Sequence, residues 1–202
     1  RVSKMTQVLA NFADVSDLTG KSVLDAGCGY GPFTMALYLS DRPARAVGAD
    51  ISEKYVRTGS QLCAETRMDD VEFVQSAFRE LTDVLDERFD VLIVNNSINF
   101  LTSRKAYKEA IREFYEILEP GGAMIILTPN RYHLTEAFTG LKGVQFLPDR
   151  IADWYVRKKG IRDGYDDIRL PSSFELVWWL RRTGFEDVQV VDAYQFTTEG
   201  WR

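Results

Sequence analysis

The sequence predicts an α/β protein, in which a doubly wound, mostly parallel sheet carries helices on both faces. The main evidence is a repeated alternation of short apolar runs with helical stretches, which is typical of parallel strands joined by crossover helices. The run 89–94 is almost entirely apolar, as expected for a strand that is buried on both faces. A chain of 202 residues, 45% of them hydrophobic, can bury one full core, so we expect a single domain over residues 1–202.

Five short strands are expected before residue 129, with helical stretches between them. The first helix starts at Pro32, because proline suits the first helical position, and Ser52 is a suitable N-cap for the second. A short helix is expected over 78–85, and the helix after it is expected to end at the sequence Pro-Gly-Gly of 120–122. The apolar stripe of that last helix is Tyr107, Ile111, Phe114, Tyr115 and Leu118, and the strands are expected over 22–25, Arg45–Asp50, Val71–Gln75, 89–94 and 123–128.

Residues 129–171 interrupt this alternation. The segment is rich in aromatic and charged residues with scattered glycines, and it is too long for a simple connection between sheet elements. Because its aromatic content argues against disorder, we expect a partly helical insertion after the fifth strand, with its main helix over 149–159. A capping-box sequence then precedes a helix over 174–183, and a sixth strand is expected over 188–193.

Composition and charge exclude several classes of protein. The formal net charge of −5 argues against a nucleic-acid substrate, because phosphate binding usually requires a basic face. Two cysteines are too few for a disulfide framework, and no Cys/His spacing resembles a metal site, so no metal is expected. The longest apolar runs are far short of a membrane span and no signal peptide opens the chain, which predicts a cytoplasmic protein. Because the chain begins with Arg1 and not with methionine, we expect that further N-terminal residues precede it.

A glycine-rich turn is the strongest functional signal. Residues 23–31 read Val-Leu-Asp-Ala-Gly-Cys-Gly-Tyr-Gly, and glycine lets backbone N–H groups come close to a nucleotide-like ligand. Pro32 stands where a dinucleotide-binding turn needs its third glycine, and the Gly-Lys-Ser or Gly-Lys-Thr of a phosphate loop is absent. Asp25 adds a carboxylate that would repel a pyrophosphate. The turn therefore predicts an adenosine-sized ligand that carries a cationic or amine group.

These residues resemble motif I of the class I S-adenosylmethionine-dependent methyltransferases. The resemblance implies the Rossmann-like sheet of that family, with S-adenosylmethionine as cofactor, S-adenosylhomocysteine as product and no metal. It implies that Asp50, at the end of the second strand, binds both ribose hydroxyls, and that Ile51 packs on the adenine. Ala77 stands where the family often has an acid for the adenine amino group, so recognition there is expected to rely on backbone groups. The cofactor residues that the resemblance implies are Asp25, Gly27, Cys28, Gly29, Gly31, Asp50, Ile51, Ala77, Phe78, Asn95 and Asn96.

The methyl acceptor is expected at the C-terminal edge of the sheet, where ligands bind in open α/β folds. His133, the only histidine, follows the fifth strand and can take a proton near neutral pH, which makes it the first candidate for a general base; Glu136 is the second. The 129–171 insertion is interpreted as a lid over the acceptor. Its sequence also resembles, loosely, a group of methyltransferases found with sugar and polysaccharide biosynthesis. The residues expected to contact the acceptor are Asn130, Arg131, Tyr132, Trp154 and Tyr155.

The sequence therefore predicts methyl transfer to a small molecule or a glycan precursor, at oxygen. Three alternatives remain open, namely methylation of a small amine, a nicotinamide-dependent oxidoreductase and a non-catalytic cofactor-binding subunit. A homodimer is compatible with the sequence. The resemblance also implies an antiparallel hairpin at the end of the sheet, and either 195–202 forms its second strand or the chain stops before it.

Overall fold

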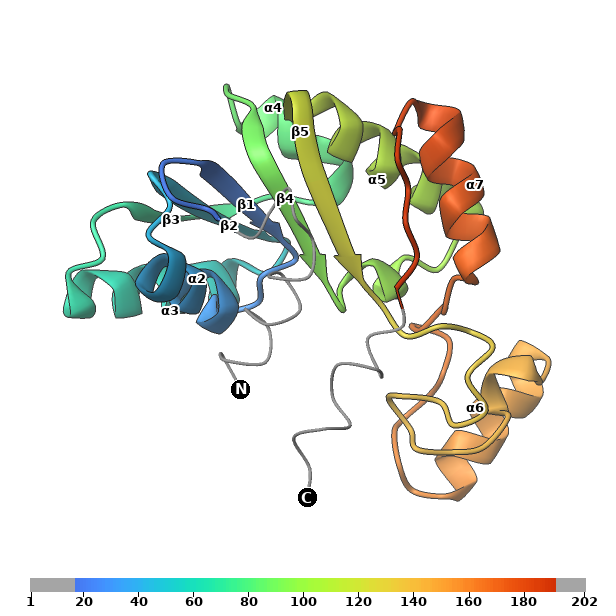
Figure 1. Ribbon diagram of the computed structural model, residues 1–202. Helices are drawn as coiled ribbons and strands as arrows, with labels where there is room; N and C mark the ends of the chain where they lie inside the picture. Colours follow the sequence, from blue (N-terminus) through green and yellow to red (C-terminus); the bar gives the residue numbers. More distant parts are fainter. Residues whose placement is uncertain (1–16, 192–202) are drawn as a thin grey trace, which may run out of the picture.

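A five-stranded parallel sheet forms the centre of the computed structural model, which describes residues 17–191. The strand order is β3-β2-β1-β4-β5, and every neighbouring pair is parallel (Figure 1). This arrangement confirms the predicted fold class. The strands are β1 (Ser22–Ala26), β2 (Arg45–Asp50), β3 (Val71–Gln75), β4 (Phe89–Asn95) and β5 (Leu118–Leu127).

Helices cover both faces of the sheet, because neighbouring residues of a strand point to opposite sides. Val23 of β1 packs in one core cluster with Leu37, whereas the adjacent Leu24 packs in another with Phe114. One face is covered by α2 (Pro32–Asp41) and α3 (Glu53–Thr66), and the other by α4 (Leu81–Val84), α5 (Arg104–Glu116) and α7 (Ser173–Thr183). Short 3₁₀ turns lie at η2 (Phe78–Glu80), η3 (Ile98–Phe100) and η4 (Val144–Phe146).

The predicted helix starts are confirmed. Pro32 opens α2, and the Ser52 hydroxyl accepts a hydrogen bond from the Tyr55 N–H at the start of α3. Ser172 and Glu175 form the predicted capping box of α7, in which each side chain accepts from the other residue's backbone N–H.

The end of α5 differs from the prediction. Leu118, assigned from the sequence to the helical stripe, is the first residue of β5, where it pairs with Phe89. The Pro-Gly-Gly sequence lies inside this strand, at an irregularity where the register shifts between Phe89 and Val91. Gly121 has φ +83°, which a bulge tolerates best at glycine. The sequence signal that usually ends a helix therefore marks a bulge in the strand.

The predicted sixth strand is also corrected. Residues 188–191 form no strand, and 192–193 lie outside the described residues, as does the expected strand over 195–202. No helix within 17–191 is long and apolar enough to cross a membrane.

The 129–171 segment lies beyond the carboxyl ends of the strands (Figure 1). It is partly helical, as predicted, and α6 (Asp149–Lys158) ends one residue before the expected boundary. The segment has a small core of its own, separate from the cores on the sheet, which explains its many aromatic residues. This core contains Val144, Ala152, Val156, Tyr165, Ile168 and Leu170.

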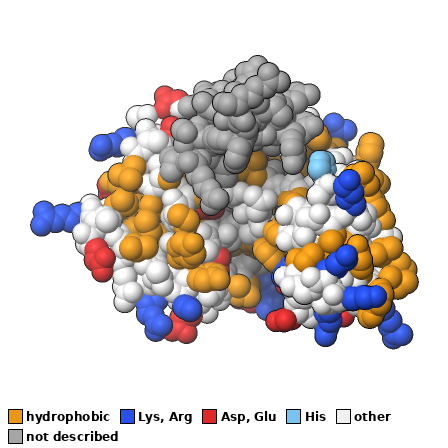
Figure 2. All heavy atoms as spheres, turned by 90° about the horizontal axis from the view of Figure 1, so that it is seen from below, with side chains coloured by type: hydrophobic (Ala, Val, Ile, Leu, Met, Phe, Trp, Pro, Cys, Tyr) orange, Lys and Arg blue, Asp and Glu red, His pale blue; other side chains and the backbone are white. Residues whose placement is uncertain are grey.

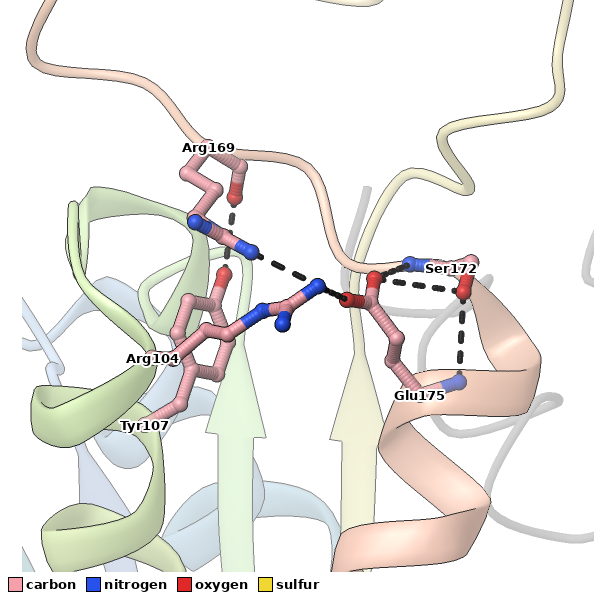
Figure 3. Close-up of polar contacts among 5 residues, drawn as sticks. All are labelled: Arg104, Tyr107, Arg169, Ser172 and Glu175. Atoms are coloured by element: carbon pink, nitrogen blue, oxygen red, sulfur yellow. Dashed lines mark hydrogen bonds and ion pairs between the residues drawn. The ribbon is translucent and has the colours of Figure 1, made fainter.

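Polar contacts fasten the returning end of this segment to the helices (Figure 3). The buried Tyr107 hydroxyl donates to the Arg169 carbonyl at 2.7 Å, and the Arg169 N–H donates to the Asn99 carbonyl at 2.8 Å. The Glu175 carboxylate lies 3.5 Å from the Arg104 guanidinium and 3.7 Å from that of Arg169. The segment is thereby held at one end by α5, η3 and the first turn of α7.

Candidate cofactor and acceptor site

The glycine turn connects β1 to α2 at the carboxyl edge of the sheet. The N–H groups of Gly27 and Cys28 both donate to the Ala49 carbonyl of β2, at 2.7 and 3.1 Å. Gly27 has φ +77°, and a Cβ there would collide with Ser97, so only glycine fits. A Cβ at Gly29 would meet no heavy atom within 4 Å. The turn is therefore packed underneath and open at its tip, where a ligand can approach the backbone.

The half-buried Asp50 fixes the tip of this turn. One carboxylate oxygen accepts from the Gly29 N–H at 2.8 Å, and the other accepts from the Ser52 N–H at 2.9 Å. The side chain thus joins the glycine turn to the start of α3. Each oxygen of a carboxylate has a further lone pair, so both can still accept from ligand hydroxyls.

Asp25 is buried directly below the turn, with 1% of its surface exposed. The Thr34 hydroxyl donates to one of its carboxylate oxygens at 2.7 Å, and the other oxygen has no hydrogen-bond partner among residues 17–191. Burial raises the pKa of this carboxyl to about 7, against the opposing hydrogen bond from Thr34. A buried acid with an unpaired oxygen suits a ligand's ammonium group, which would satisfy the oxygen and favour the ionised form.

Cys28 packs as a small side chain within the glycine turn. It is buried, and burial raises the pKa of its thiol, with the nearby Asp25 and Asp50 acting in the same direction. The thiol therefore stays protonated and is a poor nucleophile.

Exposed apolar side chains lie beside Asp50. Ile51 is 70% exposed, and Tyr30 and Tyr55 are also exposed, with their rings edge to face at 6.0 Å. Exposed large apolar side chains beside a carboxylate are suited to pack on a planar base. The two tyrosines were not predicted as site residues, although Tyr30 stands inside the glycine turn itself.

Phe78 points into the protein. Its ring packs edge to face on Phe114 of α5, with ring centroids 5.2 Å apart, and it lies under Gly27. This placement favours a supporting role beneath the turn over stacking on a base. The neighbouring Ala77 is half-buried, and its carbonyl accepts from the Ser76 hydroxyl at 3.0 Å.

The segment after β4 lies against the same turn. The Ser97 hydroxyl donates to the Ala26 carbonyl at 3.0 Å, and Asn96 adopts φ +51° while its side-chain amide donates to Asn95 at 2.9 Å. Asn99, which was not predicted, is fully buried, and neither of its side-chain amide atoms has a partner in the described part of the chain. The Thr128 hydroxyl after β5 is also buried and unpaired. Polar atoms at the ends of both adjacent strands are therefore suited to hydrogen bonds with a ligand.

The structure places His133 at the predicted edge, exposed, with its Nδ1 2.9 Å from the Thr135 carbonyl. Glu136 is 1% exposed, and its carboxylate accepts from the N–H groups of Phe138 and Thr139 and from the Thr139 hydroxyl. These contacts, at 2.6 to 2.9 Å, close a turn within the 129–171 segment. They favour a structural role for Glu136 rather than one in proton transfer.

The residues expected to contact the acceptor fall into two groups. Asn130 and Tyr132 lie just after β5, where the Asn130 side chain accepts from the Tyr132 N–H at 3.1 Å and the Tyr132 ring is exposed. The Arg131 N–H donates to the Pro171 carbonyl at 3.3 Å and so joins the two ends of the segment. Tyr155, in contrast, packs on the core of the segment, and Trp154 is 57% exposed on the opposite side of α6.

Comparison with known proteins decides the family. A family model described as a methyltransferase domain matches residues 17–178. The chain belongs to the class I methyltransferases. This family is that of the S-adenosylmethionine-dependent methyltransferases, which sets the oxidoreductase alternative aside.

Two curated relatives show the range of similar enzymes. The cypemycin N-terminal methyltransferase of a Streptomyces species is 37% identical over 111 residues, which is 54% of this chain and 42% of that protein. The ubiquinone biosynthesis O-methyltransferase of Pseudomonas entomophila is 27% identical over 174 residues, which is 86% of this chain and 68% of that protein. The chain thus spans between about two fifths and two thirds of the length of these relatives.

A solved structure supports the fold alone. The phosphoethanolamine N-methyltransferase 2 of Haemonchus contortus superposes with a TM-score of 0.67 at 17% identity, covering 91% of this chain and 37% of that chain. Within residues 17–191 no group of three or more His, Cys, Asp or Glu side chains could hold a metal ion.

Proposed function

We propose that this methyltransferase transfers a methyl group from S-adenosylmethionine to a hydroxyl oxygen of a small molecule, with the 129–171 segment as a lid over the acceptor. The observation that carries the donor half is the buried Asp25 with its unpaired oxygen, below an open glycine turn that Asp50 fixes. The oxygen acceptor is supported by the ubiquinone biosynthesis O-methyltransferases among the relatives.

The residues of the turn fit the cofactor chemically. Asp25 would hold the ammonium group, Asp50 the ribose hydroxyls, and Ile51 with Tyr30 the adenine. When bound, S-adenosylmethionine supplies a methyl group on a sulfonium, which an oxygen or nitrogen lone pair can attack. The protein's share is to align the acceptor and exclude water, which can contribute on the order of 7–11 kcal/mol to lowering the barrier.

An alcohol acceptor must lose its proton as the new bond forms, and His133 is the proposed base. Because a carbonyl oxygen only accepts, the contact with Thr135 assigns the ring hydrogen to Nδ1. The neutral ring then has its lone pair on Nε2, the atom that would take the acceptor's proton. Glu136 is the weaker candidate, because three donors already occupy its carboxylate.

Replacing the base tests this assignment. We expect His133→Ala to slow methylation of a hydroxyl acceptor by about 100-fold at saturating cofactor, and added imidazole to restore part of the rate. The measurement is methyl transfer from labelled S-adenosylmethionine to a panel of phenols and sugars, with the exposed Lys142→Ala as the control variant in the same segment. A rate close to that of the parent protein would refute the role of His133.

Transfer to an amine is the second candidate, supported by the 37% identity to the cypemycin N-terminal methyltransferase. A neutral amine attacks with its own lone pair and needs less help from a base. Amine acceptors in the same panel would then be methylated, and His133→Ala would leave their rate largely unchanged. Which acceptors of the panel are methylated, together with the effect of His133→Ala on their rates, therefore distinguishes a hydroxyl acceptor from an amine.

A further inference from the structure

The solvent-facing side of α6 combines apolar and basic side chains. At 100° per residue, the positions opposite the buried Ala152 and Val156 form one arc of the helix. None of the residues on this arc is acidic, and all of them are exposed. They are Arg150, Ile151, Trp154, Arg157 and Lys158.

Further exposed apolar residues continue this surface towards the start of α6. Phe146 is 49% exposed and Leu147 is 38% exposed, and only Pro148 separates them from the helix. The Phe146 N–H donates to the Gly143 carbonyl, and the Gly143 N–H donates to the carbonyl of Leu134, which is 62% exposed. Figure 2 shows hydrophobic side chains interspersed with Lys and Arg side chains on this part of the molecule. We call Leu134, Phe146, Leu147, Arg150, Ile151, Trp154 and Lys158 the α6 surface.

Asp149, in the first turn of α6, lies outside this arc, and two other acids of the segment are paired with arginines. Asp153 contacts Arg157 at 3.0 Å, and Asp167 contacts Arg162 at 2.7 Å. Arg150 and Lys158 remain as the cations of the α6 surface, and the Lys158 ammonium lies 4.7 Å from the centre of the Trp154 ring. The surface is therefore locally basic in a chain whose formal net charge is −5.

We propose that the α6 surface binds an anionic lipid bilayer. Tryptophan rings are stable at the boundary between headgroups and acyl chains, and Lys and Arg can extend past apolar neighbours to lipid phosphates. The surface offers both kinds of contact, and its basic charge complements the negative surface of an anionic membrane. Five large apolar side chains that are costly to leave in water would then be covered.

Partition of the whole chain onto lipid vesicles tests this inference, with no methyl donor or acceptor present. We expect binding to vesicles of phosphatidylcholine mixed with phosphatidylglycerol, weak binding to phosphatidylcholine alone, and reduced binding at high salt. Trp154→Ala is expected to lower partition about tenfold, and Arg150→Gln with Lys158→Gln about fivefold for each cation removed.

Trp178→Ala is the matched control. Trp178 is 53% exposed on α7, with Arg182 over its ring at 5.4 Å, so it repeats the arrangement of Trp154 and Lys158 outside the α6 surface. It is expected to leave partition unchanged. Equal binding to both kinds of vesicle, equal loss in the two tryptophan variants, or binding only to a soluble acidic protein would overturn the inference. Because the assay includes no substrates, such a result would leave the methyl-transfer proposal standing.

Discussion

Two carboxylates with different surroundings define the donor half of the proposed site. Asp50 is half-buried and accepts from two backbone N–H groups at the tip of the turn, whereas Asp25 is enclosed and has one oxygen unpaired. The first is suited to ligand hydroxyls and the second to a ligand cation. Replacing Asp50 therefore tests cofactor binding, and replacing Asp25 tests how stability depends on pH.

Asp50→Ala is expected to weaken S-adenosylhomocysteine binding by roughly 1.5–3 kcal/mol, the range for hydrogen bonds to a charged group. The measurement is isothermal titration calorimetry, with Asp69→Ala as an exposed control outside the turn. An affinity equal to that of the parent protein would show that Asp50 does not bind the ribose.

The raised pKa of Asp25 predicts how stability depends on pH. Its pKa is about 7 in the folded protein, against 3.8 for an unperturbed carboxyl, so between these values the folded state holds a proton that the unfolded chain has lost. The free energy of unfolding of the cofactor-free protein therefore falls as pH rises through this window, by up to about 4 kcal/mol.

Asp25→Asn removes this titration. We expect the variant to match the parent protein near pH 4 and to be more stable near pH 8, as measured by denaturant unfolding at both values. Parallel stability curves for the two proteins across the window would contradict the burial of an ionisable group at this position.

Individual site residues differed in how well the sequence indicated them. Asp25 and Asp50 stand at characteristic spacings in the sequence from the glycine turn. Because the carboxyl ends of parallel strands meet at one edge of the sheet, the sequence could place both residues there. Glu136 was predicted only as a candidate base. Its structural role was not readable from the sequence, because that role depends on which backbone N–H groups the turn brings to its carboxylate. Asn99 was equally hidden, since burial without a partner is a property of the packed structure.

At the scale of elements, experiments can most directly test the contacts that fix the returning end of the 129–171 segment. Tyr107→Phe removes the hydroxyl that donates to the Arg169 carbonyl and leaves that acceptor unpaired, at a cost of about 1–2 kcal/mol. We expect faster amide hydrogen exchange in the returning end of the segment, with little change in β1 and β4.

Tyr115→Phe is the control for this variant, because Tyr115 lies on the same helix but is exposed, with its ring against Phe185. If both variants leave exchange at Arg169 unchanged, the contact with Tyr107 does not hold the segment.

The elements themselves were mostly readable from local patterns. Buried parallel strands are continuous apolar runs, and Ser52 and Ser172 mark helix starts by side-chain chemistry alone. The boundary between α5 and β5 was not readable, because Pro-Gly-Gly serves equally as a helix stop or a bulge. Leu118 belongs to the strand because it pairs with Phe89, a contact between residues distant in the sequence that local patterns do not reveal.

For the whole molecule, the fold separates the two proposed tasks, donor binding and acceptor binding, along one edge of the sheet. The turn after β1 and the end of β2 form the proposed donor side, while the chain after β5 leads into the 129–171 segment (Figure 1). Family membership supports the first task, the binding of the methyl donor. The acceptor differs among the relatives, since a cypemycin N-terminal methyltransferase, ubiquinone biosynthesis O-methyltransferases and a demethylmenaquinone methyltransferase all match this chain.

The most direct test of the account is calorimetric titration of this chain with S-adenosylhomocysteine and, separately, with NAD. We expect S-adenosylhomocysteine to bind at one site per chain and NAD to give no binding heat, because Asp25 and Pro32 suit an ammonium-bearing ligand and not a pyrophosphate. Binding of NAD without binding of S-adenosylhomocysteine would contradict the account.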